Sequence, residues 1–372
     1  MDPKVSNLDE KNGILSMTFG GLQHTLLNSI RRVITADIPT FVFRAFPHDE
    51  NKIRISINTC RHNNEIIKQR IGCIPIHISD SEFPYEDYQV EVDKKNDGST
   101  IQFLTTEDFK IFNKNTKQYL TDASAHKFFP PNSLTGDYII VARLMPKLSE
   151  NLAGEHLKFE ADIGVSTAKQ DGMYNVASTC SFGGTIDPVK ANAAWMIRKK
   201  ELVAGKMKKE ELEFEEKNWR LLEAKRHVIE DSHEFLLESV GVYENMHLMD
   251  LGCGILIEKY KTFIENVKTN NKIIIEPNRD STVPNEFMIK LLDEDYTLAN
   301  PLVYYMYQKH YIDDKSITFV GFRKPHPHNN VGEIRMAFAE PTDASTAALY
   351  LTQAATKCAE LYKNVQNNFS KS

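Results

Sequence analysis

The sequence has few cysteines, and their spacing is not typical of a metal site or a disulfide framework. No CxxC pair occurs, which argues against a zinc knuckle or a disulfide-stapled fold. His326 and His328 lie two residues apart in "KPHPHNN", without a third ligand nearby in the sequence. We expect a turn there, and we predict neither a metal ion nor a cofactor. The five cysteines are Cys60, Cys73, Cys180, Cys253 and Cys358.

The sequence also lacks a long hydrophobic run, a secretion signal and a strong net charge. It contains no stretch of about 18 apolar residues, so no membrane-spanning helix is expected. The first residues, "MDPKVSNLDE", lack the basic-then-apolar order of a signal peptide, and we expect an intracellular protein. The net charge of −6 argues mildly against a large nucleic-acid surface. The 372 residues are enough for two or three domains.

The stretch "HLMDLGCGIL", residues 247–256, suggests a cofactor site. An apolar run reaches Asp250 and is followed by Gly252 and Gly254, as in strand–glycine turn–helix sites for nucleotide-like cofactors. Glu276 stands about where a ribose-binding carboxylate would be expected. An S-adenosylmethionine-dependent methyltransferase is therefore an alternative, although that fold needs several further βα units. We expect both glycines at the junction between a strand and a helix.

Sequence periodicity in the first part of the chain predicts two strands and a helix between them. Leu15, Met17 and Phe19 alternate on one face of an expected strand at residues 13–19. A helix is expected at residues 22–36, ended by Pro39 and followed by a strand at 40–46.

The middle of the chain combines two different patterns. Residues 47–180 contain short β-like runs between turn-rich segments, which predicts a β-rich inserted domain. Residues 188–226 are highly charged and helix-prone, and Trp195 and Trp219 are the expected packing points.

A polar connector at residues 269–284 precedes a new unit. The unit begins with a strand at "FMIKLLD", and Thr297 can cap a helix that starts at Leu298 and runs to about residue 310. Two further strands, "SITFVGF" and "EIRMAF", lead to a long helix from about residue 346 to 369.

The two ends of the chain repeat short words in the same order. The first helix opens with "TLLN", residues 25–28, and the later one with "TLAN", residues 297–300. Each leads to a similar strand, "TFVF" at residues 40–43 and "TFVGF" at 318–322, and both units finish with a helix. This similarity predicts two copies of one α+β fold in a single chain.

The two closing helices carry narrow apolar stripes. Their apolar residues step by three and four, the spacing by which two helices pack along each other at a shallow angle. The alternative is that each stripe lies on its own sheet. The expected seam consists of Leu256, Tyr260, Phe263, Val267, Leu351, Ala355, Cys358, Tyr362, Val365 and Phe369.

Several motifs resemble the α-type subunits of multisubunit RNA polymerases. "LLNSIRRVITADIPTFVF" is similar to the first helix of the bacterial α, archaeal D and eukaryotic third-largest subunits, which show an Asn, paired arginines and a Pro. "IIKQRIGCIPI" and "FLLESVG" resemble later segments of that family. "LLDEDYTLANPLVYYM" and "ITFVGFRKPHP" resemble the small partner subunit, archaeal L or its eukaryotic equivalent. The matching residues are Asn28, Arg31, Arg32, Pro39, Thr297, Asn300, Gly321, Pro325, His326 and Pro327; Tyr296 replaces the family's His and Ala299 its Gly.

The resemblance implies a fold and a division into segments. We expect two copies of the RNA polymerase α-type dimerisation fold, each an antiparallel sheet with packed helices. The larger module would comprise residues 1–46 plus 181–268, with the β-rich insert at 47–180. The connector at 269–284 would precede a smaller module at 285–372.

The resemblance also implies a function in assembly. The paired modules would form a platform for the largest, second-largest and small polymerase subunits, and DNA and RNA would be contacted only through the complex. No Asp-x-Asp-Gly-Asp-type motif for Mg²⁺ occurs, so no catalytic residue is expected in this chain. Arg31 and Arg32 are the expected contacts with the second-largest subunit, and Asn28 is expected to brace the helix.

Both modules in one chain are a pattern of large DNA viruses of eukaryotes. The resemblance therefore implies a viral polymerase located in the virion and the host-cell cytoplasm. Because one chain would contain both halves of the platform, no homodimer is expected.

Overall fold

The structure is a computed structural model that describes residues 3–147, 149, 153–269, 271–279 and 281–369. The chain divides into two units. Unit 1 comprises residues 1–34, 179–238 and 245–372, and unit 2 comprises residues 35–178 and 239–244. The unit that contains the β-rich stretch thus begins at residue 35, before the boundary expected at residue 47.

The first sheet of unit 1 has the strand order β1-β2-β13-β12 and is antiparallel where β2 meets β1 and β13. The expected strand at residues 13–19 is confirmed, because Leu15, Met17 and Phe19 of β2 are all buried. The rings of Phe19 and Phe235 pack edge-to-face across β2 and β13, with centroids 5.8 Å apart. The elements of this half are β1 (Lys4–Lys11), β2 (Ile14–Gly20), α1 (His24–Ala36), β12 (Ala177–Ile186), β13 (Val228–Ser239) and α6 (Asn245–Thr269).

The second sheet of unit 1 has the order β14-β15-β17-β16 and is antiparallel throughout. The expected connector at residues 269–284 is wrong in part, because β14 lies within it and pairs with β15 from Ile273 to Pro277. A π-helix follows α7, from Tyr307 to Asp313. The elements of this half are β14 (Ile273–Pro277), β15 (Glu286–Leu292), α7 (Tyr296–Met306), β16 (Ile317–Arg323), β17 (Val331–Phe338) and α8 (Ala344–Gln366).

The two sheets share one order of elements along the chain. Each half runs strand, strand, helix, strand, strand, helix, apart from the insertions in the first half. The predicted pairing of the words "TFVF" and "TFVGF" is wrong, however. The first word lies in β3 (Thr40–Val42), which pairs with β11 (Gly164–Ser166) in unit 2, whereas the counterpart of β16 in the first sheet is β12. Aromatic and β-branched residues suit many strands, so a short shared word does not identify equivalent ones.

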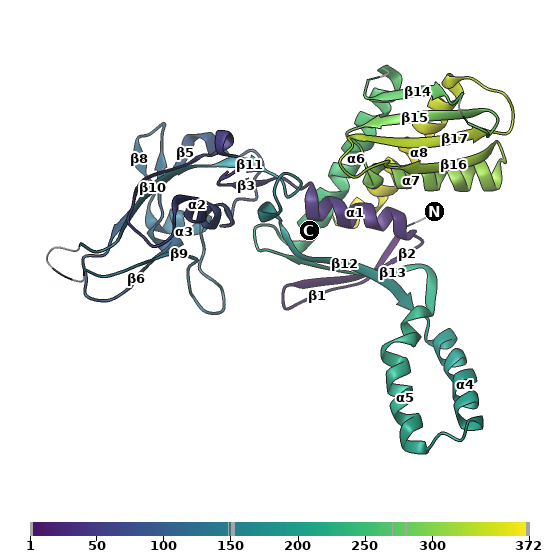
Figure 1. The fold of residues 1–372 in the computed structure, drawn as a ribbon, viewed down its shortest axis with the longest axis horizontal. Coiled ribbons are helices and arrows are strands. Elements are labelled where there is room, and N and C mark those ends of the chain that lie inside the picture. Colours follow the sequence, from purple (N-terminus) through teal and green to yellow (C-terminus); the bar gives the residue numbers. More distant parts are fainter. Residues whose placement is uncertain (1–2, 148, 150–152, 270, 280, 370–372) are drawn as a thin grey trace. The chain divides into compact units, whose positions relative to one another are not determined.

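Helices lie between the two sheets of unit 1. Helix α6 contacts β2 of the first sheet, and α8 and α7 contact β14 and β16 of the second. Helices α6 and α8 also pack along each other, so they form a continuous helical layer between the sheets. Figure 1 shows α1, α6, α7 and α8 grouped between the strands of the two sheets.

A helical hairpin is inserted between β12 and β13. It consists of α4 (Pro188–Ala204), α5 (Lys209–Leu221) and a short 3-10 turn at Glu223–Arg226. The side chain of Asp187 caps α4 by accepting hydrogen bonds from the backbone of Val189 and Lys190. The ring centroids of Trp195 and Trp219 lie 5.8 Å apart, which confirms the predicted packing points.

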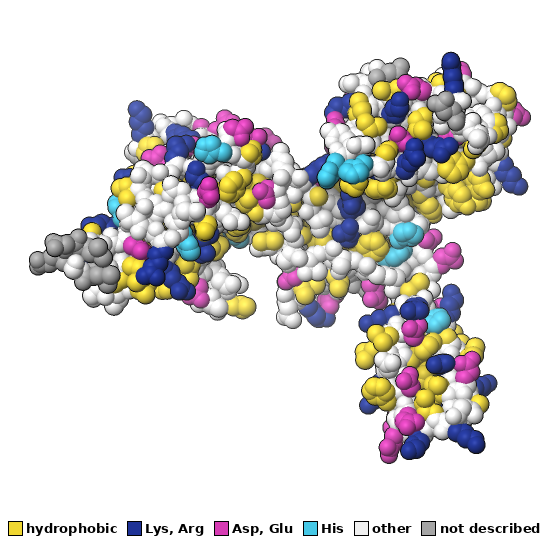
Figure 2. Space-filling model, viewed as in Figure 1, with side chains coloured by type: hydrophobic (Ala, Val, Ile, Leu, Met, Phe, Trp, Pro, Cys, Tyr) yellow, Lys and Arg dark blue, Asp and Glu magenta, His cyan; other side chains and the backbone are white. Residues whose placement is uncertain are grey.

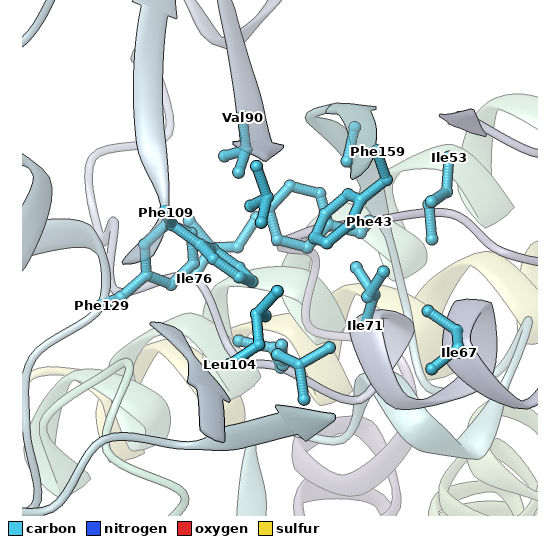
Figure 3. Close-up of a cluster of buried hydrophobic side chains, with 14 of the residues drawn as sticks. Phe43, Ile53, Ile67, Ile71, Ile76, Val90, Leu104, Phe109, Phe129 and Phe159 are labelled. Carbon is cyan, nitrogen blue, oxygen red and sulfur yellow. The ribbon is translucent and has the colours of Figure 1, made fainter. Parts of the chain in front are cut away.

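Unit 2 contains a five-stranded sheet of order β4-β10-β5-β7-β8, and the two-stranded pairs β11-β3 and β6-β9. Its core combines aliphatic side chains with packed phenylalanine rings. Phe43 stacks on Phe129 at 6.0 Å between centroids, and Phe109 packs edge-to-face on Phe159 at 5.8 Å. Figure 3 shows these rings together with Ile67 and Ile71 of α2.

The other strands of unit 2 are β4 (Ile53–Asn58), β5 (Tyr88–Lys95), β6 (Gln102–Thr105), β7 (Lys110–Asn113), β8 (Gln118–Tyr119), β9 (Ile140–Leu144) and β10 (His156–Asp162). Its helices are α2 (Asn64–Gly72) and α3 (Asp122–Phe128), with 3-10 turns at His48–Glu50, Tyr85–Asp87, Thr106–Asp108 and Gly172–Tyr174.

Candidate functional site

The central feature of unit 1 is the interface between α6 and α8. Every residue of the predicted seam is buried, with at most 4% of its surface exposed. The steps of three and four residues place these side chains on one face of each helix, where they cover each other. One detail of the prediction is wrong: α8 ends at Gln366, so Phe369 is buried from the turn that follows the helix.

Two tyrosines connect the halves of the chain reciprocally. The rings of Tyr260 in α6 and Tyr362 in α8 stack, with centroids 5.8 Å apart and planes 13° apart. The Tyr260 hydroxyl donates to the carbonyl oxygen of Leu298 in α7 at 3.1 Å, and the Tyr362 hydroxyl donates to that of Leu26 in α1 at 3.2 Å. Burial raises the pKa of both phenols well above the ordinary value, so both remain neutral donors.

These contacts have an approximate two-fold relationship. Leu26 and Leu298 occupy the same place in the repeated words "TLLN" and "TLAN". A tyrosine of the first half binds the second half at one of them, and a tyrosine of the second half binds the first half at the other. Exchange of equivalent contacts is the mark of a two-fold, self-complementary interface. Here the two surfaces belong to one chain.

A proline in α7 is matched by a serine in α1. Pro301 lies inside α7 rather than in its first turn and has no N–H for the carbonyl oxygen of Thr297, four residues earlier. The hydroxyl of Ser29, 1% exposed, donates to that oxygen at 2.6 Å. A buried carbonyl that the helix leaves without a partner is therefore satisfied from the other half of the chain. Nothing in the local sequence marks Ser29 for this role, because its partner lies 268 residues away.

The start of α7 differs from the prediction. Asp295, not Thr297, caps the helix, because its side chain accepts a hydrogen bond from the Thr297 N–H at 2.8 Å. Thr297 lies in the first turn, and its hydroxyl accepts a hydrogen bond from Arg32. An Asp just before a helix is a recognised capping signal that the sequence analysis passed over.

The paired arginines of α1 have different surroundings. Arg32 donates to Thr297 at 2.8 Å and forms an ion pair with Asp295 at 2.9 Å. Burial alone would raise the pKa of Asp295, but hydrogen bonds from Thr297 and the charge of Arg32 outweigh it and lower that pKa. Arg31 donates to the side chain of Asn28 at 3.1 Å, so Asn28 braces its own helix. Arg32 thus has a contact within the chain that the sequence analysis did not predict.

The "DLGCG" stretch does not form the expected junction between a strand and a helix. It lies inside α6, which begins at Asn245. A β-carbon on Gly252 would come within 2.8 Å of the Ile34 side chain, so this glycine permits close approach of α6 and α1. Glu276 lies in β14 and forms an ion pair with Lys290 at 3.1 Å. The described residues of this stretch are helical and do not form the glycine turn that a cofactor would need. The site on which the methyltransferase interpretation depended is therefore not formed.

The remaining motif residues lie around β16 and α7. Tyr296, in place of the family's His, packs edge-to-face on Phe322 with centroids 5.0 Å apart, and Ala299 is fully buried. The segment from Pro325 to Pro327 forms part of the turn between β16 and β17, as expected. His326 accepts a hydrogen bond from the backbone of His328 at 3.2 Å. Among the described residues, no three potential ligands of His, Cys, Asp or Glu gather as a metal site would require.

The second sheet contains a buried carboxylate that is ion-paired and hydrogen-bonded. The Glu286 side chain is fully buried and accepts hydrogen bonds from Arg335 of β17, one of them at 2.7 Å. Asn278 donates to it at 2.9 Å, and Ser281 donates to it as well. The hydrogen bonds from Arg335 lead in lowering the pKa of Glu286 to about 2.

Two comparisons with known proteins concern the second half of this interface. Residues 286–368 match the family model of the RNA polymerase Rpb3/Rpb11 dimerisation domain. The DNA-directed RNA polymerase II subunit rpb11 of Dictyostelium discoideum is 30% identical over 92 residues, which are 24% of this chain and 69% of that protein. The chain belongs to the Rpb3/Rpb11 family of RNA polymerase subunits.

The Rpb3/Rpb11 domain contains one side of the seam. It begins at β15 and includes α7, β16, β17 and α8, and hence Thr297, Pro301 and Tyr362. The expected resemblance of this region to the small partner subunit is confirmed. None of the helices in the described part of the chain combines the length and apolar character that crossing a bilayer requires.

Proposed function

We propose that the chain is an assembly-platform subunit of a multisubunit DNA-directed RNA polymerase whose two dimerisation modules pair within one molecule. The first module would consist of the sheet β1-β2-β13-β12 with α1 and α6. The second would be the Rpb3/Rpb11 domain together with β14. The reciprocal bonds from Tyr260 to Leu298 and from Tyr362 to Leu26 are the observation that carries this proposal.

Pairing within the chain is favoured by the short link between the modules. Helix α6 ends at Thr269 and β14 begins at Ile273. So short a tether holds the two surfaces at an effective concentration of about millimolar or more, which favours pairing within a chain over pairing between chains. We therefore expect a monomer.

The family match supports a proposal about the partners. We propose that the platform binds the largest and second-largest subunits and small polymerase subunits, and that it contacts DNA and RNA only through the complex. Arg31 remains a candidate contact with the second-largest subunit, whereas Arg32 would contribute first to pairing of the modules. A viral source and a location in the virion and host-cell cytoplasm remain part of the proposal.

Purification of the tagged full chain from cells that contain its polymerase tests this function. Mass spectrometry should find the two large subunits with the chain, at comparable amounts after size-exclusion chromatography. A tagged Phe263→Asp variant, in which pairing of the modules should be disrupted, serves as the control. It should recover less of both large subunits. Recovery of the chain without either large subunit would contradict the proposal.

A further inference from the structure

A pocket in unit 2 combines arginines with aliphatic side chains. It has a volume of about 510 Å³ and lies where α2 meets β9. Its polar lining comes from Arg61, His62, Arg70 and Arg143. Figure 2 shows dark blue side chains beside yellow ones over β6 and β9, where this surface lies. All of the lining residues belong to unit 2, so the pocket is separate from the helix interface.

In the part of the chain that the structure describes, the arginines of the pocket form no ion pair. The carboxylate of Glu155 lies at the edge of the pocket, where it accepts a hydrogen bond from the Met145 N–H at 2.9 Å. No carboxylate is among the described lining residues, and none of the described carboxylates forms an ion pair with Arg61 or Arg143. Arg70 uses its guanidinium to hold β9, donating to the carbonyl oxygens of Val141 at 2.7 Å and Ile140 at 2.8 Å. The Arg143 guanidinium lies over the ring of Phe103, 5.6 Å from its centroid. This concentration of positive charge stands in a chain whose net charge is −6.

The apolar part of the pocket is exposed. Ile101 is 49% exposed and Ile140 is 43% exposed, and Met145 lies beside them on the lining. Strand β9 pairs with β6 in a two-stranded sheet, so these side chains lie on a small, open surface. A ligand that covered them would gain hydrophobic free energy as well as charge pairing.

We propose that this pocket binds an acidic peptide segment of a partner protein that carries an aliphatic side chain. Carboxylates would pair with Arg61 and Arg143, and the aliphatic side chain would cover Ile101 and Ile140. Guanidinium groups suit carboxylates because they donate two parallel hydrogen bonds. Single-stranded nucleic acid fits less well, because its bases stack on open aromatic rings. The apolar lining residues are aliphatic, and the ring of Phe103 beside them already carries the Arg143 guanidinium. The proposal does not depend on the pairing of the two modules.

Selection of peptides on the full chain tests the proposal. Random twelve-residue peptides displayed on phage are selected on the immobilised protein, and an enriched peptide is synthesised with fluorescein for polarisation measurements. We expect enriched peptides to contain Asp or Glu next to Leu, Ile or Val, and to bind more weakly as salt is raised. The double variant Arg61→Glu/Arg143→Glu should bind such a peptide at least about tenfold more weakly. Ile140→Ser should weaken binding a few-fold, because it removes the apolar contact.

A matched double variant provides the control. Lys117→Glu/Lys127→Glu makes the same change in charge at exposed positions of unit 2 outside the pocket and should bind like the wild-type chain. Thermal unfolding monitored by circular dichroism should show that both double variants are folded. The proposal is overturned if no acidic peptide is enriched, or if both double variants bind equally. It is also overturned if a fluorescein-labelled thymidine 20-mer binds more tightly than the peptides and requires Arg61 and Arg143.

Discussion

The hydroxyl of Ser29 donates a hydrogen bond of 2.6 Å to the carbonyl oxygen of Thr297, which lies 268 residues further along the chain. That oxygen lacks its usual helical donor because residue 301 is proline. A serine in the first half of unit 1 therefore completes the backbone hydrogen bonding of the second half.

This relationship predicts a coupling between residues 29 and 301. Ser29→Ala should lower the free energy of unfolding by about 1–3 kcal/mol, because it leaves a buried carbonyl without a donor. In a Pro301→Ala background the same substitution should cost less, since the new N–H can bond to Thr297. Urea unfolding of the four proteins of this double-mutant cycle measures the coupling. Equal costs in both backgrounds would show that Ser29 does not serve the gap left by Pro301.

The seam should not tolerate a charge. Phe263 of α6 is 2% exposed, so a carboxylate at this position would have little access to water. Phe263→Asp should lower the free energy of unfolding by about 3–5 kcal/mol. Thr262→Asp adds the same charge on the exposed face of the same helix and should change it by less than about 0.5 kcal/mol. Light scattering should give a single-chain mass for the wild type. A wild-type homodimer that persists at nanomolar concentration, with an unaffected Phe263→Asp variant, would count against intramolecular pairing.

Substitutions of the two arginines of α1 should differ in their effects on stability and on assembly. Arg32→Ala should lower the melting temperature, because it removes the bonds to Asp295 and Thr297, which together contribute about 1–2 kcal/mol. Arg31→Ala should lower the melting temperature less than Arg32→Ala, because its hydrogen bond to Asn28 lies within one helix, and it should weaken capture of the second-largest subunit in a pull-down. The double variant should show both effects. If Arg31→Ala captures that subunit as well as wild type does, Arg31 is not a partner contact.

Protonation of Glu286 should lower the stability of the folded chain in acid. Its pKa is lowered to about 2 in the folded chain, so its contribution is present above the unfolded pKa of about 4.5 and is lost as the pH falls towards 2. The lowered pKa corresponds to on the order of 3 kcal/mol at neutral pH. Chemical unfolding measured from pH 6 to pH 2 should show a shallower decline for Glu286→Gln than for wild type. Parallel curves would mean that this carboxylate is not held in its charged form by folding.

Even a methyl group at position 252 should lower the stability of the chain. Gly252→Ala would press on Ile34 at 2.8 Å, and we expect a loss of about 1–3 kcal/mol that exceeds the gain of up to about 1 kcal/mol in helix propensity. Gly254→Ala is the control, since it meets only the flexible Gln366 amide at 3.3 Å. Adding Ile34→Ala should relieve part of the loss in Gly252→Ala. Thermal unfolding measures all of these variants, and greater stability of Gly252→Ala would refute the close approach.

Local periodicity was enough to predict many elements and most of the seam. Alternation at Leu15, Met17 and Phe19 requires only that one face of a strand be buried, and the spacing from Leu256 to Val267 requires only one buried helix face. The repeated words at residues 25–28 and 297–300 likewise lie in corresponding helices of the two halves. These features were readable because they depend on neighbours within a turn or two of the chain.

Other features were decided by contacts between distant residues. The stretch around Gly252 resembles a turn in sequence, but packing against Ile34 explains why glycine stands inside a continuous helix. The segment from Ile273 to Pro277 looked like a connector and became a strand because β15 offers it a hydrogen-bonding edge. Ser29 carries no local signal at all, since its partner exists only after Thr297 is brought beside it. Sequence periodicity therefore determined which faces are buried, and tertiary packing decided what each face meets, because strand pairing and helix contact join residues far apart in the chain.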